Sequence, residues 1–220
     1  MVDLLQKTLV EYYKISSPVR LMFDQIGDCE FDLDDSCCFV LEKGRGKASF
    51  HNENGSLKVL CYENFINQCK RPKSFAEGRK RCDFILCHDS SGGSFVLNEI
   101  TSAYGDERNL ELPILRGNPQ YPGGKNQKVV DQFVHTLTTL LEIPDIRTKI
   151  NSYNRKMCLM SYKVFPCNSE VIDKTLAAAY SYRKIESLET QGDGAIIEEK
   201  RINELGFEYR RISHDYSFSL

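Results

Sequence analysis

The chain has no long apolar run, no pair of cysteines two residues apart and almost no net charge. A helix that crosses a bilayer needs about 20 consecutive apolar residues, so the sequence predicts no transmembrane segment and no membrane partner. Residues 1–7 carry an acid and an amide but no cationic leader, which argues against a secretory signal. The spacing of the nine cysteines does not match zinc or C-x-x-C redox motifs. We interpret them as free thiols of a protein from the reducing cytoplasm.

The balance of charge excludes a general attraction to nucleic acid. The sequence has 29 Lys and Arg against 31 Asp and Glu, a formal net charge of -2. Any contact with a phosphate backbone must therefore come from a local patch of cations. The length of 220 residues suits one domain, or one domain with an appendage, and is enough to bury a sizeable core.

Apolar periodicity and turn residues divide the chain into short elements. The helices predicted in this way cover residues 3–15, 125–142, a segment capped by Asn168 or Ser169, and 195–205. The predicted strands cover residues 37–43, 47–52, 57–63, 157–165 and 207–213. We expect the first three strands to form a meander that leads into a central hairpin. The polar segment 102–124 has no periodicity and is interpreted either as a functional flap or as a mobile loop.

Two apolar, β-rich runs predict that hairpin, and each run carries one acid. They are residues 82–87, with Asp83, and residues 95–101, with Glu99, and a Gly/Ser turn joins them. An acid at a strand end is usually solvated or paired with a nearby cation. Glu99, however, lies among apolar neighbours, where a carboxylate is costly to bury without a metal or a partner.

The register of the hairpin decides whether the two acids meet. Opposed residues in a hairpin have position numbers with a constant sum. If the turn centres on Ser91, Asp83 lies across from Glu99 on one face, with Thr101 next along that face. A shift by one residue instead places Asp83 across from Ile100 and separates the acids. The sequence leaves both registers open.

A cluster of cations directly precedes Asp83. Its members are Lys70, Arg71, Lys73, Arg79, Lys80 and Arg81, opposed only by Glu77. Such a cluster is typical of a surface that holds a phosphate backbone, and it is equally compatible with a solvated loop. Under the first interpretation the nucleic-acid-binding residues are Lys73, Arg79, Lys80 and Arg81.

The order of helix, strands, acid-bearing hairpin, helix and strand resembles the core of the restriction-endonuclease-like, or PD-(D/E)xK, nucleases. The resemblance rests on Cys82-Asp83 at the start of one strand and on Glu99-Ile100-Thr101 near the end of the next. It implies an α/β (α+β) fold with a central mixed β-sheet flanked by helices. It also implies a nuclease-like core over residues 1–165, and we expect residues 166–220 to add a C-terminal helix and strand packed on that core.

By this resemblance the two acids hold Mg²⁺ or Mn²⁺, hard cations that prefer oxygen ligands. The implied metal ligands are Asp83 and Glu99, together with the main-chain carbonyl of Ile100. The metal activates water and stabilises charge on the scissile phosphate.

The chain departs from the family pattern because Thr101 occupies the lysine position. A hydroxyl cannot supply the positive charge that orients and activates water. One explanation is that Lys125 or Lys128, at the start of the following helix, supplies the charge. The helix then also positions nucleic acid through Gln127 or Gln132. The other explanation is that the fold has lost its chemistry and serves to bind.

We therefore predict a metal-dependent nuclease-fold protein that hydrolyses DNA phosphodiesters, of the kind that antiviral defence systems use as an effector. The alternative is a catalytically silent subunit that docks a protein partner or a second copy of itself. An exposed patch of aromatic side chains would favour the alternative. The candidates for that patch are Tyr104, Tyr121, Tyr180, Tyr182 and Phe207.

Overall fold

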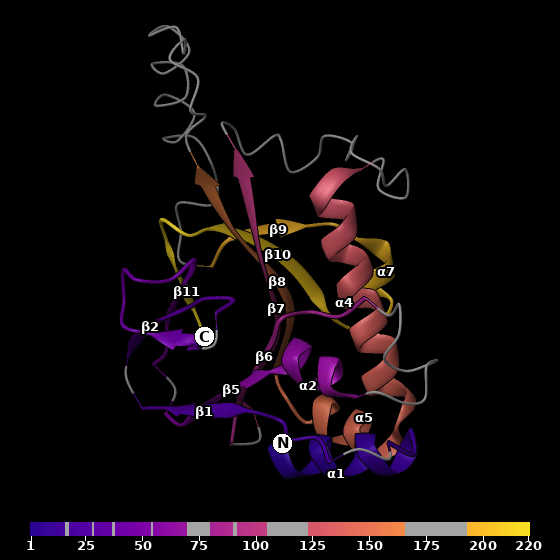
Figure 1. Ribbon diagram of the computed structural model, residues 1–220. Coiled ribbons are helices and arrows are strands. Elements are labelled where there is room, and N and C mark those ends of the chain that lie inside the picture. Colours follow the sequence, from indigo (N-terminus) through magenta and orange to yellow (C-terminus); the bar gives the residue numbers. More distant parts are fainter. Residues whose placement is uncertain are drawn as a thin grey trace, which may run out of the picture.

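The structure is a computed structural model, and it consists of a central β-sheet with helices on one side and a smaller sheet on the other (Figure 1). It describes residues 1–15, 18–27, 29–36, 38–53, 55–69, 80–89, 92–104, 123–165 and 193–220. Several predictions lie outside these ranges, among them the helix capped by Asn168 or Ser169 and the segment 105–122.

The central sheet has seven strands in the order β1-β5-β6-β7-β8-β10-β9. Their bounds are β1 Phe23–Ile26, β5 Leu57–Cys61, β6 Phe84–His88, β7 Ser94–Tyr104, β8 Arg155–Phe165, β9 Ala195–Ile197 and β10 Glu208–Ser213. Strands β1, β5, β6 and β7 pair antiparallel, whereas β7, β8 and β10 run parallel. The predicted mixed α/β class is therefore confirmed.

Parallel pairing of β7 with β8 requires the chain to cross over between them. It does so through α4 (Gly124–Glu142) and α5 (Pro144–Asn151). The helix predicted over 125–142 is confirmed, because Val129, Phe133 and Leu137 recur at helical spacing and are all buried. Pro144 begins α5, where a missing N–H has no cost. The sequence analysis did not anticipate α5.

A second sheet of four strands has the order β11-β4-β2-β3. Its strands are β2 Glu30–Leu33, β3 Val40–Leu41, β4 Ala48–His51 and β11 Ser217–Ser219. The predicted meander was wrong in this respect, since β3 and β4 belong to the second sheet and only β5 joins the hairpin. The buried faces of both sheets share one apolar cluster that contains Phe50, Phe218 and Phe84, and this shared burial explains why β3 and β4 leave the central sheet.

The five described helices cover the opposite face of the central sheet (Figure 1). The three not yet given are α1 Val2–Tyr12, α2 Tyr62–Gln68 and α7 Lys200–Asn203. Leu9 of α1, Phe65 of α2 and Ile202 of α7 belong to one buried cluster with the helix-facing residues of the sheet. Residues 62 and 63 were predicted to end a strand. They instead begin α2.

The C-terminal segment enters both sheets. The strand predicted over 207–213 is confirmed as β10. The helix predicted over 195–205 was wrong at its start, because residues 195–197 form β9, which pairs with β10. The helix is limited to α7, and Gly206 ends it with a φ of +80°, a value that glycine adopts without strain.

The described cysteines are free thiols, as expected from their spacing. They are Cys29, Cys38, Cys61, Cys69, Cys82, Cys87 and Cys158. No helix in the described ranges combines the length and the apolarity that a membrane crossing requires.

Candidate functional site

The hairpin of β6 and β7 has the register that brings the two acids together. Phe84 pairs with Asn98, and Ile85 pairs with Leu97. Asp83 is therefore the next residue outward on one strand and Glu99 the next on the other. Ile85 and Leu97 face the helices, so alternation along each strand directs Asp83, Glu99 and Thr101 to that same face.

The two acids are joined at the point where the β6–β7 ladder stops. The backbone N–H of Asp83 donates to Glu99 Oε2 at 3.1 Å. The backbone N–H of Ile100 donates to Asp83 Oδ2 at 2.8 Å. Each carboxylate thus accepts a main-chain N–H of the other strand, just beyond the last paired residues, Phe84 and Asn98. We refer to Asp83 and Glu99 as the acid pair.

A polar stripe on α4 packs against the acid pair. Its residues, Lys128, Gln132 and Thr136, recur every four positions and therefore share one face of the helix. Gln132 Nε2 donates to Glu99 Oε1 at 2.6 Å and to the carbonyl of Arg81 at 2.8 Å. Thr136 Oγ1 accepts from the N–H of Cys82 at 3.0 Å. The stripe fixes the residues immediately before β6.

Both members of the acid pair are largely buried, which disfavours their charged forms. The pKa of Asp83 is raised to about 7, chiefly by burial and in part by the charge of Glu63, while the Ile100 N–H and Lys128 oppose the rise. Burial, followed by the charge of Asp83, holds the pKa of Glu99 well above its ordinary value of 4.5, against the opposing effects of Gln132 and Lys128. Raised carboxyl pKa values of this kind are common at sites that bind a proton or a cation.

The two candidate lysines on α4 differ in what surrounds them. The Lys125 ammonium donates to the carbonyl of Ser102, and burial followed by the charge of Lys128 lowers the pKa of Lys125. Lys128 is exposed, and its charge acts on both acids. Thr101 is half-buried on the same face of β7. Lys128 is therefore better placed than Lys125 to act as the positive charge beside the acid pair.

The basic cluster before Asp83 is partly neutralised by contacts within the protein. Lys80 donates to Asp131 Oδ2 at 2.6 Å, and Asp131 also accepts from Arg201 of α7 at 2.9 Å. Arg81 donates to Asn67. Lys73 and Arg79 lie outside the described residues.

The two candidate glutamines have different surroundings. Gln127 Oε1 accepts from the N–H of Gly123 at the start of α4. Gln132, which the sequence suggested as a contact to nucleic acid, is only 7% exposed, and its amide nitrogen donates to Glu99. In the sequence, the four-residue spacing of Lys128, Gln132 and Thr136 on one face of the helix was the signal for this role.

Glu63 is a residue near the site that the sequence analysis did not identify. It lies in the first turn of α2, and its backbone N–H donates to the carbonyl of Asp83 at 3.1 Å. Its carboxylate raises the pKa of both acids. The sequence analysis placed Glu63 at the end of the strand predicted over 57–63, and for that reason did not place it beside the acid pair.

The donors at the acid pair suit a hard cation that retains much of its water. No three side chains of His, Cys, Asp or Glu among the described residues are placed to hold a metal together. Mg²⁺, however, is commonly held by one or two carboxylates and several waters. Asp83 and Glu99 supply such carboxylates, and burial, the main cause of their raised pKa values, disfavours their charged forms when no cation is nearby.

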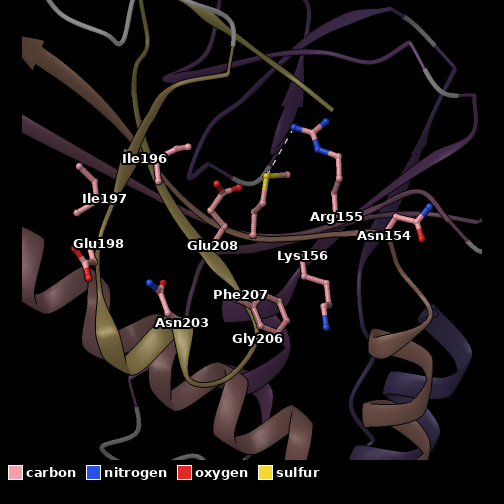
Figure 2. A pocket seen from close by; sticks show the side chains of 11 residues that line it. Asn154, Arg155, Lys156, Ile196, Ile197, Glu198, Asn203, Gly206, Phe207 and Glu208 are labelled. Atoms are coloured by element: carbon pink, nitrogen blue, oxygen red, sulfur yellow. Dashed lines mark hydrogen bonds between the residues drawn. The ribbon is translucent and has the colours of Figure 1, made fainter.

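A separate groove lies near the start of β8 (Figure 2), and neither member of the acid pair lines it. It has a volume of about 720 Å³ and lies between the first residues of β8 and the short edge strand β9. Two of its charged side chains have partners within the protein: Glu208 accepts from Arg210 at 2.9 Å, and Lys156 donates to Asn151 at 3.2 Å. Phe207 lines the groove but is only 4% exposed.

Comparison with protein-family models, with curated proteins and with solved structures found no match to this chain.

Proposed function

We propose that this chain has a restriction-endonuclease-like core and hydrolyses DNA phosphodiesters with the help of Mg²⁺ or Mn²⁺ held at the acid pair. The observation that carries the proposal is the meeting of Asp83 and Glu99 across β6 and β7, where both are largely buried and bear raised pKa values. The order of α1, the antiparallel strands β5, β6 and β7, the helix α4 and the parallel strand β8 supports it.

The proposal assigns a different task to each residue around the acid pair. Asp83 and Glu99 would hold the cation, with the Ile100 carbonyl as a further oxygen. A bound Mg²⁺ supplies an activated water and stabilises charge on the phosphate. Lys128 supplies the positive charge that Thr101 cannot. Gln132 holds the Glu99 carboxylate in place through its 2.6 Å hydrogen bond.

The direct test is plasmid degradation by the purified chain, with and without Mg²⁺ or Mn²⁺. We expect cleavage that needs the cation and that falls by at least about 100-fold in Glu99→Ala, because removing one of two carboxylates removes much of the cation site. Circular dichroism checks that the variant is folded. A Glu99→Ala protein that cuts at the wild-type rate would refute the proposal.

A second candidate function is a catalytically silent subunit that binds a protein partner or a second copy. The observation in its favour is that the family's lysine is replaced by Thr101, while Glu99 already has hydrogen-bond partners. The aromatic patch suggested for such docking loses Phe207, which is buried against Phe95 with ring centroids 6.1 Å apart. The side chains of Tyr104, Tyr121, Tyr180 and Tyr182 lie outside the described residues.

Titration of the chain with Mn²⁺ separates the two candidates. Binding that is lost in Asp83→Ala supports the nuclease. A folded wild-type chain that binds no cation supports the silent subunit. In that case, analytical ultracentrifugation tests whether the chain associates with itself.

A further inference from the structure

One polar atom beside the acid pair is buried and has no hydrogen-bond partner among the described residues. It is Gln132 Oε1, on a side chain that is 7% exposed. A buried acceptor without a donor costs about 1–3 kcal/mol, so such an atom usually faces a water, an ion or a ligand. This atom belongs to the amide whose nitrogen is 2.6 Å from Glu99 Oε1.

The orientation of the amide is determined by its neighbours. Gln132 Nε2 faces two acceptors, Glu99 Oε1 at 2.6 Å and the Arg81 carbonyl at 2.8 Å. Rotating the amide by half a turn would place its oxygen against both acceptors and lose both hydrogen bonds. In this orientation, Oε1 has no donor among the described residues.

We infer that Gln132 contributes its amide oxygen to the cation site of the acid pair, as a third side-chain oxygen beside Asp83 and Glu99. The inference rests on the proposed function and adds a cation ligand to it. Amide oxygens are suitable donors toward hard cations. The nitrogen of the same amide also holds Glu99, so Gln132 orders both an acidic and a neutral oxygen around one position.

The test is the Mn²⁺ affinity of the full chain, measured by electron paramagnetic resonance of free Mn²⁺ at about pH 8, above the Asp83 pKa of about 7. Two variants separate a cation role from a structural one. Gln132→Met keeps the length of the side chain and removes both polar atoms. Gln132→Glu keeps an oxygen and adds charge, but loses the hydrogen bond to Glu99.

We expect Gln132→Met to bind Mn²⁺ about tenfold more weakly than the wild type, the usual scale for a lost residue that supports a metal site. We expect Gln132→Glu to bind at least as tightly as the wild type, because a third carboxylate attracts the cation. The matched control is Gln6→Met on α1, where Gln6 Oε1 accepts from the Leu21 N–H. This control should leave the affinity unchanged.

Each other outcome overturns the inference in a distinguishable way. Equal weakening in both variants would show that Gln132 only supports Glu99. Wild-type affinity in Gln132→Met would show that its oxygen does not face the ion. A wild-type chain that binds no Mn²⁺ would overturn the proposed function and this inference together. Thermal unfolding of each variant checks that the affinities belong to folded protein.

Discussion

The two ends of the β6–β7 hairpin differ in how completely their buried polar groups are paired by hydrogen bonds. At the turn end, His88 Nδ1 accepts from the Ser94 N–H at 3.0 Å, and Nε2 contacts Asn52 Oδ1 at 3.1 Å. The Tyr153 hydroxyl donates to the His88 carbonyl at 3.0 Å. At the open end, the acid pair concentrates negative charge, and one oxygen of Gln132 has no partner among the described residues.

The contrast separates an end whose buried polar groups are paired from an end where two acids are buried together. The hydrogen bonds of the turn end match donors to acceptors around a neutral imidazole, so this end holds the strands together. The open end buries two acids whose charged forms are disfavoured, so ionising them reduces stability. Substitutions at the two ends should therefore affect different measurements.

The largest expected effect is on cation binding at the open end. Replacing Glu99 with Ala should weaken Mn²⁺ binding by at least about 100-fold, because one of two carboxylate ligands is lost. Isothermal titration calorimetry measures the affinity. The matched control is Glu208→Ala on β10, an acid already paired with Arg210, which should bind Mn²⁺ as the wild type does. Equal losses in both variants would indicate nonspecific attraction by surface acids.

The next effect is on folding at the turn end. A Cβ added at Gly93 would lie 2.5 Å from His88 Cβ, so Gly93→Ala should lower the free energy of unfolding by about 2–3 kcal/mol through overpacking. Urea denaturation measures the change. Gly27→Ala is the control, since a Cβ there meets nothing within 4 Å. If the Gly93 variant matched this control, the close packing around His88 would be refuted.

A third prediction concerns stability at the open end, measured without divalent cations. The folded pKa of Asp83, about 7, lies above its ordinary 3.8. The protonated acid is therefore favoured in the folded state, and its contribution is lost as pH rises from 3.8 to 7. Asp83→Asn should be more stable than the wild type by about 1–2 kcal/mol near pH 8.

The reason is that the amide oxygen of the substituted side chain can still accept the Ile100 N–H, while the buried charge is removed. The advantage should shrink toward pH 4, where Asp83 is itself protonated. Urea denaturation at both pH values gives the comparison. An advantage that does not change with pH would contradict the raised pKa.

The smallest expected effect is an acid-induced loss at the turn end. Burial lowers the pKa of His88 below its ordinary 6.5, so the unfolded chain binds this proton more readily than the folded chain. The contribution of His88 to stability is complete above pH 6.5 and declines as the pH falls below 6.5 toward the folded pKa. His88→Gln should flatten this slope in a pH series of unfolding measurements. His51→Gln, on the other sheet, should leave the slope in place.

The sequence supported the elements that depend on local pattern. The apolar spacing of Val129, Phe133 and Leu137 predicted α4, and the Gly/Ser turn between two β-rich runs predicted the hairpin. Local pattern also misled. The β-rich stretch at 57–63 predicted a strand that includes Tyr62 and Glu63. These residues instead begin α2, because their N–H groups donate to the Asp83 carbonyl.

The sequence by itself determined the chemistry that is available, namely two acids in apolar strands, a neutral residue at Thr101 and a polar stripe on one helix face. Only the tertiary structure decided the hairpin register, the separation of β3 and β4 into a second sheet and the contact between Gln132 and Glu99. The physical reason is that a one-residue shift reverses the face of every side chain in a strand. Both registers satisfy the local pattern, and packing of α4 over one face selects between them.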